Sequence, residues 1–276
     1  MLALFPGEAY QAHVLESAFA EEQYAATAAG METALLDFEA LTEAGDARRA
    51  VRGVSSIAAP VPALYRGWML SPTQYEQLYR ALAAKNWLLI NTPDSYRHAH
   101  FLPENYSILA GSTPETVWLP VTPGFQIEQV FPLLRRFGDS PVIVKDYVKS
   151  QKHHWNEACF IPAASDQSAV RRVVARFLEL QGGELAEGLV FRAYAALKPI
   201  GTHLRSGMPL TAEFRCFFLD GELLAEAPYW DEAEYDAAAA GSGSILPPPS
   251  LRFAGVARQV RSRFFTMDVA QQDAGG

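Results

Sequence analysis

Residues 141–162 read PVIVKDYVKSQKHHWNEACFIP. The run PVIVK at 141–145 is rich in β-branched residues and ends in a lysine, which predicts a buried strand with a charge at its end. The run EACFIP at 157–162 is the expected return partner, so residues 146–156 form a hairpin-like loop. This loop and its flanking lysine hold a single acid, Asp146, and five basic side chains: Lys145, Lys149, Lys152, His153 and His154. Such a loop is either a solvated turn or a local binding site for anions.

The chain after this stretch reads as a helix followed by strands. A helix over 168–180 is stopped by Gly182-Gly183, and Asp220-Gly221 predicts a tight turn between two strands. The expected strands are 188–197, 213–219, 222–226 and 264–269. Residues 237–249 are Ala, Gly, Ser and Pro and predict a linker, and residues 251–263 predict a basic helix.

The chain before this stretch alternates strands and helices. Strands are expected at 2–5, 31–38, 63–70 and 87–90, and helices at 15–29 and 73–85, the second opened by Ser71-Pro72. Residues 39–60 are expected to form a poorly defined connection and residues 94–125, which contain four prolines, a loop-rich connector. The order strand, helix, strand predicts a parallel α/β unit, with a domain boundary near residue 125.

Composition limits the class of protein. With 276 residues, of which 49% are hydrophobic, the chain suits a globular protein of two or three lobes. No stretch approaches the roughly 20 apolar residues of a membrane span, and the N-terminus lacks the basic start of a signal peptide. Two cysteines without a histidine at ligand spacing fit a reducing cytoplasm. The net charge of −8 disfavours nucleic acid as a partner but leaves a local basic groove possible.

Common nucleotide and nucleophile motifs are absent, which directs attention to charged residues on strands. The sequence has no G-x-x-x-x-G-K-[ST], G-x-G-x-x-G or G-x-S-x-G. Lys145 can reach a phosphate or extend into water. Arg192, inside an apolar strand, needs an anionic ligand or a structural partner such as Glu213. Glu213 and Arg215 face one side of a strand, and Asp268 suits either a hard cation or a structural capping role.

The order of these features resembles the ATP-grasp superfamily, in which two α+β lobes close on ATP. The stretches that carry the resemblance are LYRGWMLSPTQY at 64–75, PVIVKDYVKSQKHHWNEACFIP at 141–162, GLVFRAY at 188–194, EFRCFFLDGELL at 213–224 and RFFTMDVA at 263–270. Together they look like the branch grouped around two arginines and a lysine, whose members have been likened to RNA ligases. The resemblance implies a Rossmann-like pre-ATP-grasp domain over 1–125 and an ATP-grasp domain over 126–276. That second domain would have a lid lobe to about 187 and a C-terminal lobe from about 188.

The resemblance also implies a role for individual residues, with ATP and Mg²⁺ as cofactors. Lys145 would bind the α- and β-phosphates, and the loop 146–156 would be the lid, with Lys149 and Lys152 as further contacts. The hinge whose backbone meets the adenine edge would be Phe191, Arg192, Ala193 and Tyr194. Glu213 falls at the position of a ribose-binding acid, Arg215 would face the phosphates or the transferred group, and Asp268 would be the first magnesium ligand. Lys152 and Arg215 are the candidate catalytic residues.

The implied activity is an ATP-dependent ligase that joins a carboxylate to a nucleophile through an acyl phosphate, with Tyr65, Arg66 and Trp68 as candidates to line the substrate side.

The family's closing strand, with Glu-x-Asn-like metal ligands, should follow a turn at 272–276, where the sequence stops. Either the chain continues or the second acidic metal site is missing, which affects catalysis more than binding. The alternatives are a non-catalytic nucleotide-binding or regulatory module and an ATP-dependent enzyme that modifies nucleic-acid ends.

Overall fold

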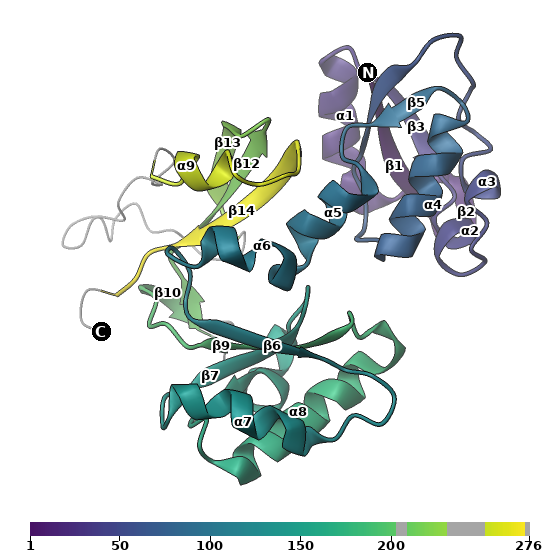
Figure 1. Cartoon of the computed structure of the whole chain (residues 1–276). Helices are drawn as coiled ribbons and strands as arrows, with labels where there is room; N and C mark the ends of the chain where they lie inside the picture. The colour runs from purple at the N-terminus through teal and green to yellow at the C-terminus, as the bar shows by residue number, and fades with distance from the viewer. Residues whose placement is uncertain (203–208, 231–251, 274–276) are drawn as a thin grey trace. The chain divides into compact units, whose positions relative to one another are not determined.

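The computed structural model describes residues 1–202, 209–230 and 252–273, so the expected linker at 237–249 lies outside the described residues. The chain divides into two compact units (Figure 1). Unit 1 comprises Met1–Arg97 and Ser262–Phe264, and unit 2 comprises His98–Arg261 and Phe265–Gly276. The division falls inside a helix, α5 (Pro93–His100). No helix in the described part is long and apolar enough to cross a membrane.

Unit 1 is built on a five-stranded sheet. Its strands are β1 (Leu2–Glu8), β2 (Gln11–Leu15), β3 (Glu32–Leu36), β4 (Val61–Tyr65) and β5 (Trp87–Leu89). Strand β1 pairs in parallel with β3 and β4, and β4 pairs in parallel with β5. The predicted parallel α/β unit is therefore confirmed. Strand β2, which pairs antiparallel with β1, was not expected.

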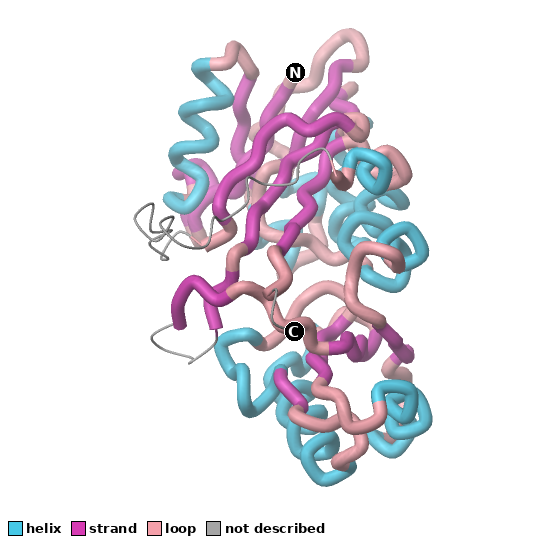
Figure 2. Tube along the Cα trace, turned by 90° about the vertical axis from the view of Figure 1, so that its left-hand side faces the viewer, coloured by secondary structure: helices cyan, strands magenta, loops and turns pink. Residues whose placement is uncertain are grey.

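Helices cover both faces of this sheet. Leu2 and Leu4 of β1 pack in one core with α4 (Pro72–Ala83), whereas Ala3 and Phe5 pack in another with residues next to α1 (Ala20–Ala28). In Figure 2 the strands of unit 1 run between helices on either side. A strand buried on both faces has a continuous apolar sequence, as LALF in β1 does.

The helices of unit 1 begin at side-chain caps. Ser71 and Gln74 form a reciprocal capping box at α4, which confirms the helix expected from Ser71-Pro72. The expectation of a poorly defined connection over 39–60 is wrong. This segment contains α3 (Ala47–Ala50) and most of α2 (Phe38–Thr42), which are capped by the side chains of Asp46 and Asp37. Helices this short have little periodicity, so only their caps could have indicated them.

Unit 2 contains a four-stranded antiparallel sheet in the order β6-β9-β7-β8. Its strands are β6 (Thr116–Pro120), β7 (Val142–Asp146), β8 (Phe160–Ile161) and β9 (Gly188–Ala193). The predicted pairing of 141–145 with 157–162 is confirmed by β7 and β8. One face of the sheet packs on α8 (Gln167–Gln181) through Val173, Val174 and Phe177. Figure 1 shows α7 (Phe131–Leu134) and α8 along the same face.

The segment 94–125 is more ordered than its prolines predict. It holds α5, α6 (Leu102–Leu109) and β6. Pro103 lies in the first turn of α6, where a missing N–H costs no helical hydrogen bond. The expectation of a loop-rich connector is therefore wrong. The sequence-based boundary near residue 125 lies beyond these three elements, and the two units divide inside the first of them, after Arg97.

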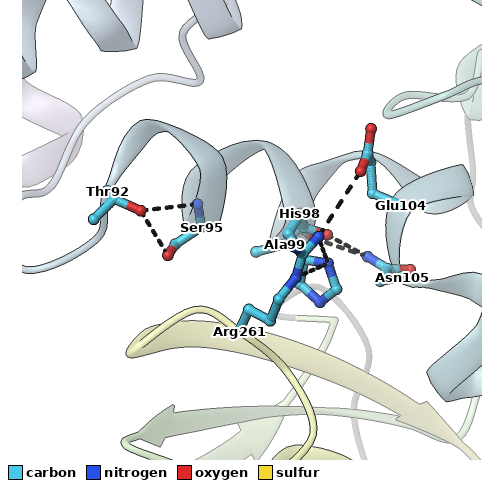
Figure 3. A network of polar contacts seen from close by, with 7 residues as sticks. All are labelled: Thr92, Ser95, His98, Ala99, Glu104, Asn105 and Arg261. Atoms are coloured by element: carbon cyan, nitrogen blue, oxygen red, sulfur yellow. Dashed lines mark hydrogen bonds and ion pairs between the residues drawn. The ribbon is translucent and has the colours of Figure 1, made fainter.

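A polar network joins α5, α6 and the chain before the last strand within unit 2 (Figure 3). The Arg261 guanidinium lies 2.9 Å from Nδ1 of His98 and 4.0 Å from the Glu104 carboxylate. Asn105 donates to the carbonyl oxygen of His98 at 2.9 Å. Burial and the neighbouring Arg261 lower the pKa of His98, so the imidazole is held in its neutral form.

A three-stranded sheet in the order β13-β12-β14 and a short hairpin complete unit 2. The strands of the sheet are β12 (Glu213–Leu219), β13 (Glu222–Pro228) and β14 (Phe264–Ala270), and those of the hairpin are β10 (Pro199–Thr202) and β11 (Pro209–Thr211). Asp220 and Gly221 have φ values of 51° and 79°, which is the backbone of the predicted tight turn. The expected helix over 251–263 is reduced to α9 (Ala254–Ala257).

Candidate functional site

Lys145 and Arg192 emerge from the same face of the β6-β9-β7-β8 sheet. In the antiparallel register Ile143 is opposite Arg192, and Lys145 is opposite Val190. Because residues directly opposite share a face, and residues two apart along a strand do too, both cations lie on one face. This face is the one turned away from α8, whose contacts go to Val142, Val144 and Phe191.

The two cations have polar contacts but no acidic partner. Lys145 Nζ donates to the carbonyl oxygen of Val148 at 3.0 Å, and Arg192 Nε donates to Thr116 Oγ1 at 3.3 Å. Across residues 1–202, 209–230 and 252–273 neither makes an ion pair, so the structural pairing of Arg192 with Glu213 is not observed. Glu213 instead accepts a hydrogen bond from the Thr211 hydroxyl, among its contacts.

Burial changes how these groups titrate, and for Lys145 the nearby Asp146 carboxylate opposes only part of the effect. Burial lowers the pKa of Lys145 from 10.5 to about 8, with the positive charge of Arg192 as the next cause. Burial also lowers the pKa of Arg192. A desolvated cation is costly unless an anion or a set of hydrogen bonds compensates it. This face of the sheet is therefore suited to an anionic ligand.

Aromatic side chains lie next to these cations. Phe160 is opposite Ile143, and Tyr194 follows Arg192 by two residues, which places both on the cationic face. The ring centroids of Trp155 and Phe160 are 5.5 Å apart with nearly parallel planes, and those of Phe160 and Tyr194 are 5.3 Å apart edge to face. The face thus combines an apolar, π-rich part with a cationic part, as a nucleotide with a base and phosphates requires.

The basic loop is anchored at its base by Asp146. This side chain is fully buried and accepts hydrogen bonds from the backbone N–H groups of Val148, Lys149 and Ala186 and from the Gln181 amide. The loop continues as one 3₁₀ turn, η4 (Lys152–His154), and one π turn, η5 (Trp155–Cys159). The Lys149 side chain is exposed, whereas Lys152 is half-buried.

Lys152 contacts aromatic residues at the end of β13. Its ammonium lies 5.0 Å from the ring centroid of Tyr229 and 5.3 Å from that of Trp230, and 3.5 Å from the Tyr229 hydroxyl. The guanidinium carbon of Arg215 lies 4.7 Å from the Tyr229 ring centroid. The two predicted catalytic residues, Lys152 and Arg215, therefore both contact the Tyr229 ring. Tyr229 is uncharged, so a search of the sequence for charged residues on strands does not find it.

Arg215 and Asp268 form a bidentate ion pair between β12 and β14. Arg215 Nε donates to Oδ1 at 2.8 Å and Nη2 donates to Oδ2 at 2.9 Å. This hydrogen bonding is the main cause that raises the pKa of Arg215. Both side chains are about 40% exposed, at 42% and 38%. In this arrangement both oxygens of the predicted metal ligand are already bound, and no group of three or more His, Cys, Asp and Glu side chains in the described ranges is placed to hold a metal.

The predicted hinge offers less free backbone than expected. The Phe191 side chain is buried in the core that faces α8, and its backbone lies between two paired strands. The N–H groups of Ala193 and Tyr194 donate to the carbonyl oxygens of Glu115 at 2.8 Å and Pro141 at 3.0 Å. A base edge would therefore have to meet the Tyr194 side chain or the chain that follows it.

Sequence reasoning gave no role to Asp146 and Tyr229, which contact the basic loop and the predicted site residues. Asp146 counted only as one acid in a basic stretch, and its buried position depends on Gln181 and Ala186, which are distant in sequence. Tyr229 and Trp230 follow an exposed strand, and an aromatic pair there gives no indication of its partners. Of the residues considered for the substrate side, Arg66 forms a bidentate ion pair with Glu22 at 2.7 and 2.9 Å.

Comparisons with known proteins identify the family of the second half of the chain. Residues 136–276, a little more than half of the chain, match a family model for an ATP-grasp domain, family 3 of the clade named after two arginines and a lysine. No curated protein matches the sequence closely enough to count as a relative.

Several solved structures share the fold at low sequence identity. A RimK domain ATP-grasp protein from Sphaerobacter thermophilus DSM 20745 superposes with a TM-score of 0.55 at 16% identity, covering 100% of this chain and 87% of that one. D-alanine–D-alanine ligase from Bacillus anthracis, complexed with ATP, gives 0.51 at 14%, covering 99% and 81%. The ATP-grasp ligase PsnB, complexed with minimal precursor, Mg and ADP, gives 0.50 at 11%, covering 100% and 86%. The family match over more than half of the chain shows that it belongs to the ATP-grasp proteins, in family 3 of the clade named after two arginines and a lysine.

Proposed function

We propose that this protein binds ATP with Mg²⁺ and uses it to join a carboxylate to a nucleophile. The observation that carries the proposal is the pair of half-buried cations, Lys145 and Arg192, on one face of a sheet, neither of which makes an ion pair in the described part of the chain. A polyphosphate supplies the missing negative charge, and the adjoining rings of Phe160 and Tyr194 offer a surface for a base.

Each group has a role in this proposal. Lys145 and Arg192 bind the phosphates next to the sheet, and Lys152 binds them from the loop, with Lys149 as an exposed further contact. Glu213 binds the ribose, and Arg215 binds the γ-phosphate or the group to which it is transferred. Asp268 is the acid that would hold Mg²⁺, and the metal would supply positive charge beside the phosphates. To take that role, Asp268 must exchange Arg215 for the metal.

The reaction we propose needs no nucleophilic side chain. A carboxylate oxygen of the substrate attacks the γ-phosphorus, the bond to the β–γ bridging oxygen breaks, and ADP leaves. An amine or similar nucleophile then attacks the acyl carbon, inorganic phosphate leaves, and the proton of the nucleophile passes to phosphate or solvent. The cations keep the two reactants in line and neutralise the phosphates. Two ligases of similar fold have been solved with such molecules bound, one with ATP and PsnB with minimal precursor, Mg and ADP.

Calorimetric titration of ATP in the presence of Mg²⁺ tests the binding step. Charge-assisted bonds contribute roughly 1.5–3 kcal/mol, so Lys145→Met is expected to weaken ATP binding about ten- to a hundred-fold. Lys85→Met is the matched control, because the Lys85 ammonium also donates to a backbone carbonyl, that of Val54 at 2.6 Å. Equal ATP affinity in wild type and Lys145→Met rules out the proposed phosphate contact.

Product analysis tests the chemistry. Incubation with ATP, Mg²⁺ and mixtures of carboxylates and amines is expected to release ADP and phosphate. Release of AMP instead would indicate nucleotidyl transfer, as in enzymes that modify nucleic-acid ends. Tight ATP binding without turnover under any of these mixtures would favour a regulatory module.

A further inference from the structure

Tyr229 connects two parts of unit 2 that are distant in sequence. It follows β13, and its N–H donates to the carbonyl oxygen of Glu213, the first residue of β12, at 3.0 Å. Its backbone is therefore fixed to the strand that carries Glu213 and Arg215. Its side chain contacts Lys152, which belongs to the basic loop after β7.

The contacts of the Tyr229 ring are mainly with cations. Lys152 Nζ lies 5.0 Å and Arg215 Cζ 4.7 Å from the ring centroid, both within the roughly 6 Å range of a cation–π interaction. A further ring contact is with Trp230, edge to face at 4.8 Å. Tyr229 is half-buried and belongs to none of the apolar clusters of the described residues. A tyrosine whose main role was core packing would contact mainly apolar side chains instead of cations.

The two cations depend on this ring to different degrees. Arg215 is also fixed by both oxygens of Asp268. Lys152 makes no ion pair within the described ranges, and its hydrogen bond and ring contacts there are with Tyr229 and Trp230. Its charge also acts on Lys145 and Cys159. Tyr229 is the residue that contacts both Lys152 and Arg215, so its ring fixes the position of one cation relative to the other.

We infer that Tyr229 is a positioning residue, which holds Lys152 at a fixed distance from Arg215 so that both can bind the transferred phosphate. This inference rests on the proposed function. Transfer between two bound reactants requires its charged partners to be placed within a fraction of an ångström, and small misplacements are costly. Tyr229 would act through Lys152, without itself touching the reacting atoms.

A double-mutant cycle on binding of a non-hydrolysable ATP analogue with Mg²⁺ tests this. Tyr229→Leu removes the ring and is expected to weaken binding roughly three- to thirty-fold. Tyr229→Phe keeps the ring and should stay within about three-fold of wild type. Because Tyr229 acts through Lys152, Tyr229→Leu should have less than about a three-fold effect in the Lys152→Met background. Tyr24→Leu, at a tyrosine that is 78% exposed in α1, controls for loss of a surface ring.

The outcomes separate the inference from the function on which it rests. Undiminished binding by Tyr229→Leu, or fully additive effects in the cycle, would overturn the positioning role while the response of Lys145→Met still supports nucleotide binding. Failure of the wild type to bind the analogue would overturn both. Hydrogen exchange of residues 146–156 in the ligand-free protein is independent of ATP. It should accelerate in Tyr229→Leu and in Lys152→Met but not in Tyr229→Phe. If Tyr229→Leu fails to fold, Lys152→Met carries the test, and unchanged exchange in that variant overturns the inference.

Discussion

The lowered pKa of Lys145 predicts that nucleotide binding depends on pH. In the proposed site its ammonium form would bind phosphate, and burial lowers its pKa to about 8 in the free protein. ATP favours the charged form and raises this pKa, so binding above pH 8 must take up a proton. The secondary ionisation of phosphate, near pH 6, lies well below this window. ATP affinity is therefore expected to be nearly constant up to about pH 7, to be about half its plateau value at pH 8, and to fall about ten-fold per pH unit above that.

The same titration of Lys145 changes the free energy of unfolding in the opposite direction with pH. Between about pH 8 and the ordinary lysine pKa of 10.5 the unfolded chain holds more protons at this position than the folded protein. The contribution of Lys145 to the free energy of unfolding therefore increases as the pH rises through that window. Titrations at pH 7, 8, 9 and 9.5 check the binding prediction, and Lys145→Met should bind weakly with no such dependence. An equally steep loss in Lys145→Met would assign the titration to another group.

The Arg215–Asp268 pair predicts that magnesium binds poorly without nucleotide. Both carboxylate oxygens are bound by Arg215, so the metal must displace a bidentate partner before it can bind. ATP would change this balance because its phosphates attract Arg215 and add oxygen ligands for Mg²⁺, which usually keeps several waters as well. We expect Asp268→Asn to abolish the increase in ATP affinity that Mg²⁺ causes, and to leave metal-free ATP binding unchanged or tighter.

Titration of Mg²⁺ in the absence of nucleotide gives an independent measurement. Arg215→Gln releases the Asp268 carboxylate and should tighten binding of the metal alone several-fold, although it weakens ATP binding. The pair is partly exposed, so its loss should change the free energy of unfolding by only about 1 kcal/mol or less. Unfolding of Asp268→Asn, with an intact metal response in the folded fraction, would make this aspartate structural.

At the scale of elements, Asp146 determines how β7 ends and the basic loop begins. Asp146→Ala would leave four donors without their acceptor, those of Val148, Lys149, Gln181 and Ala186. Buried groups left unsatisfied cost roughly 1–3 kcal/mol each before relaxation, so a loss of about 3–5 kcal/mol in the free energy of unfolding is expected. Urea denaturation measures it. Asp139→Ala is the control, because exposed Asp139 accepts from the Ser165 hydroxyl, and it should cost under about 1 kcal/mol.

Elements with strong local signals could be predicted from the sequence. The strands at 142–146, 188–193 and 213–219 are apolar runs with β-branched or aromatic residues, and α8 ends at Gly182, whose φ of 49° suits glycine. The elements that were missed are short or contain proline, as α2, α3 and β6 do. Their stability comes from pairing and packing with distant segments, which a local pattern does not contain.

The residues of the candidate site likewise divide into those that could be predicted from local sequence and those that could not. Lys145 and Arg192 were identifiable because a charge in an apolar strand is conspicuous, and the sheet places them on one face. The pairing of Arg215 with Asp268 was not predicted, because it depends on β14 lying next to β12. Tyr229 was missed because an aromatic ring can stabilise a cation without any sequence signature of its own.

At the scale of the whole molecule, unit 1 contains a segment from the far end of the chain. The Asn91 side chain donates to the carbonyl oxygen of Phe264 at 2.7 Å and accepts from the N–H groups of Arg263 and Phe264 at 3.0 and 3.1 Å. Arg66 adds a cation–π contact with the Phe264 ring at 5.7 Å. The Asn91 amide thus takes the place of a strand partner for residues 263–264.

We expect Asn91→Ala to lower the free energy of unfolding by about 2–4 kcal/mol, because it removes three hydrogen bonds and leaves their backbone partners without a replacement. Thermal and urea unfolding measure this loss. Asn156→Ala, at an exposed asparagine of the basic loop, is the control and should stay within about 0.5 kcal/mol of wild type. A near-neutral Asn91→Ala would show that water replaces the side chain and that residues 262–264 are held by other contacts.

The return of residues 262–264 to unit 1 has a consequence for biosynthesis. A ribosome makes Met1–Arg97 first, and then the whole of His98–Arg261 before the last piece of unit 1 is translated. At roughly 5–20 residues per second, residues 263–264, which bind the Asn91 side chain, are synthesised on the order of ten to thirty seconds after the rest of the N-terminal unit. An N-terminal fragment that ends at Arg97 is therefore an incomplete unit, and adding a peptide that spans residues 262–264 is the complementation expected to stabilise it.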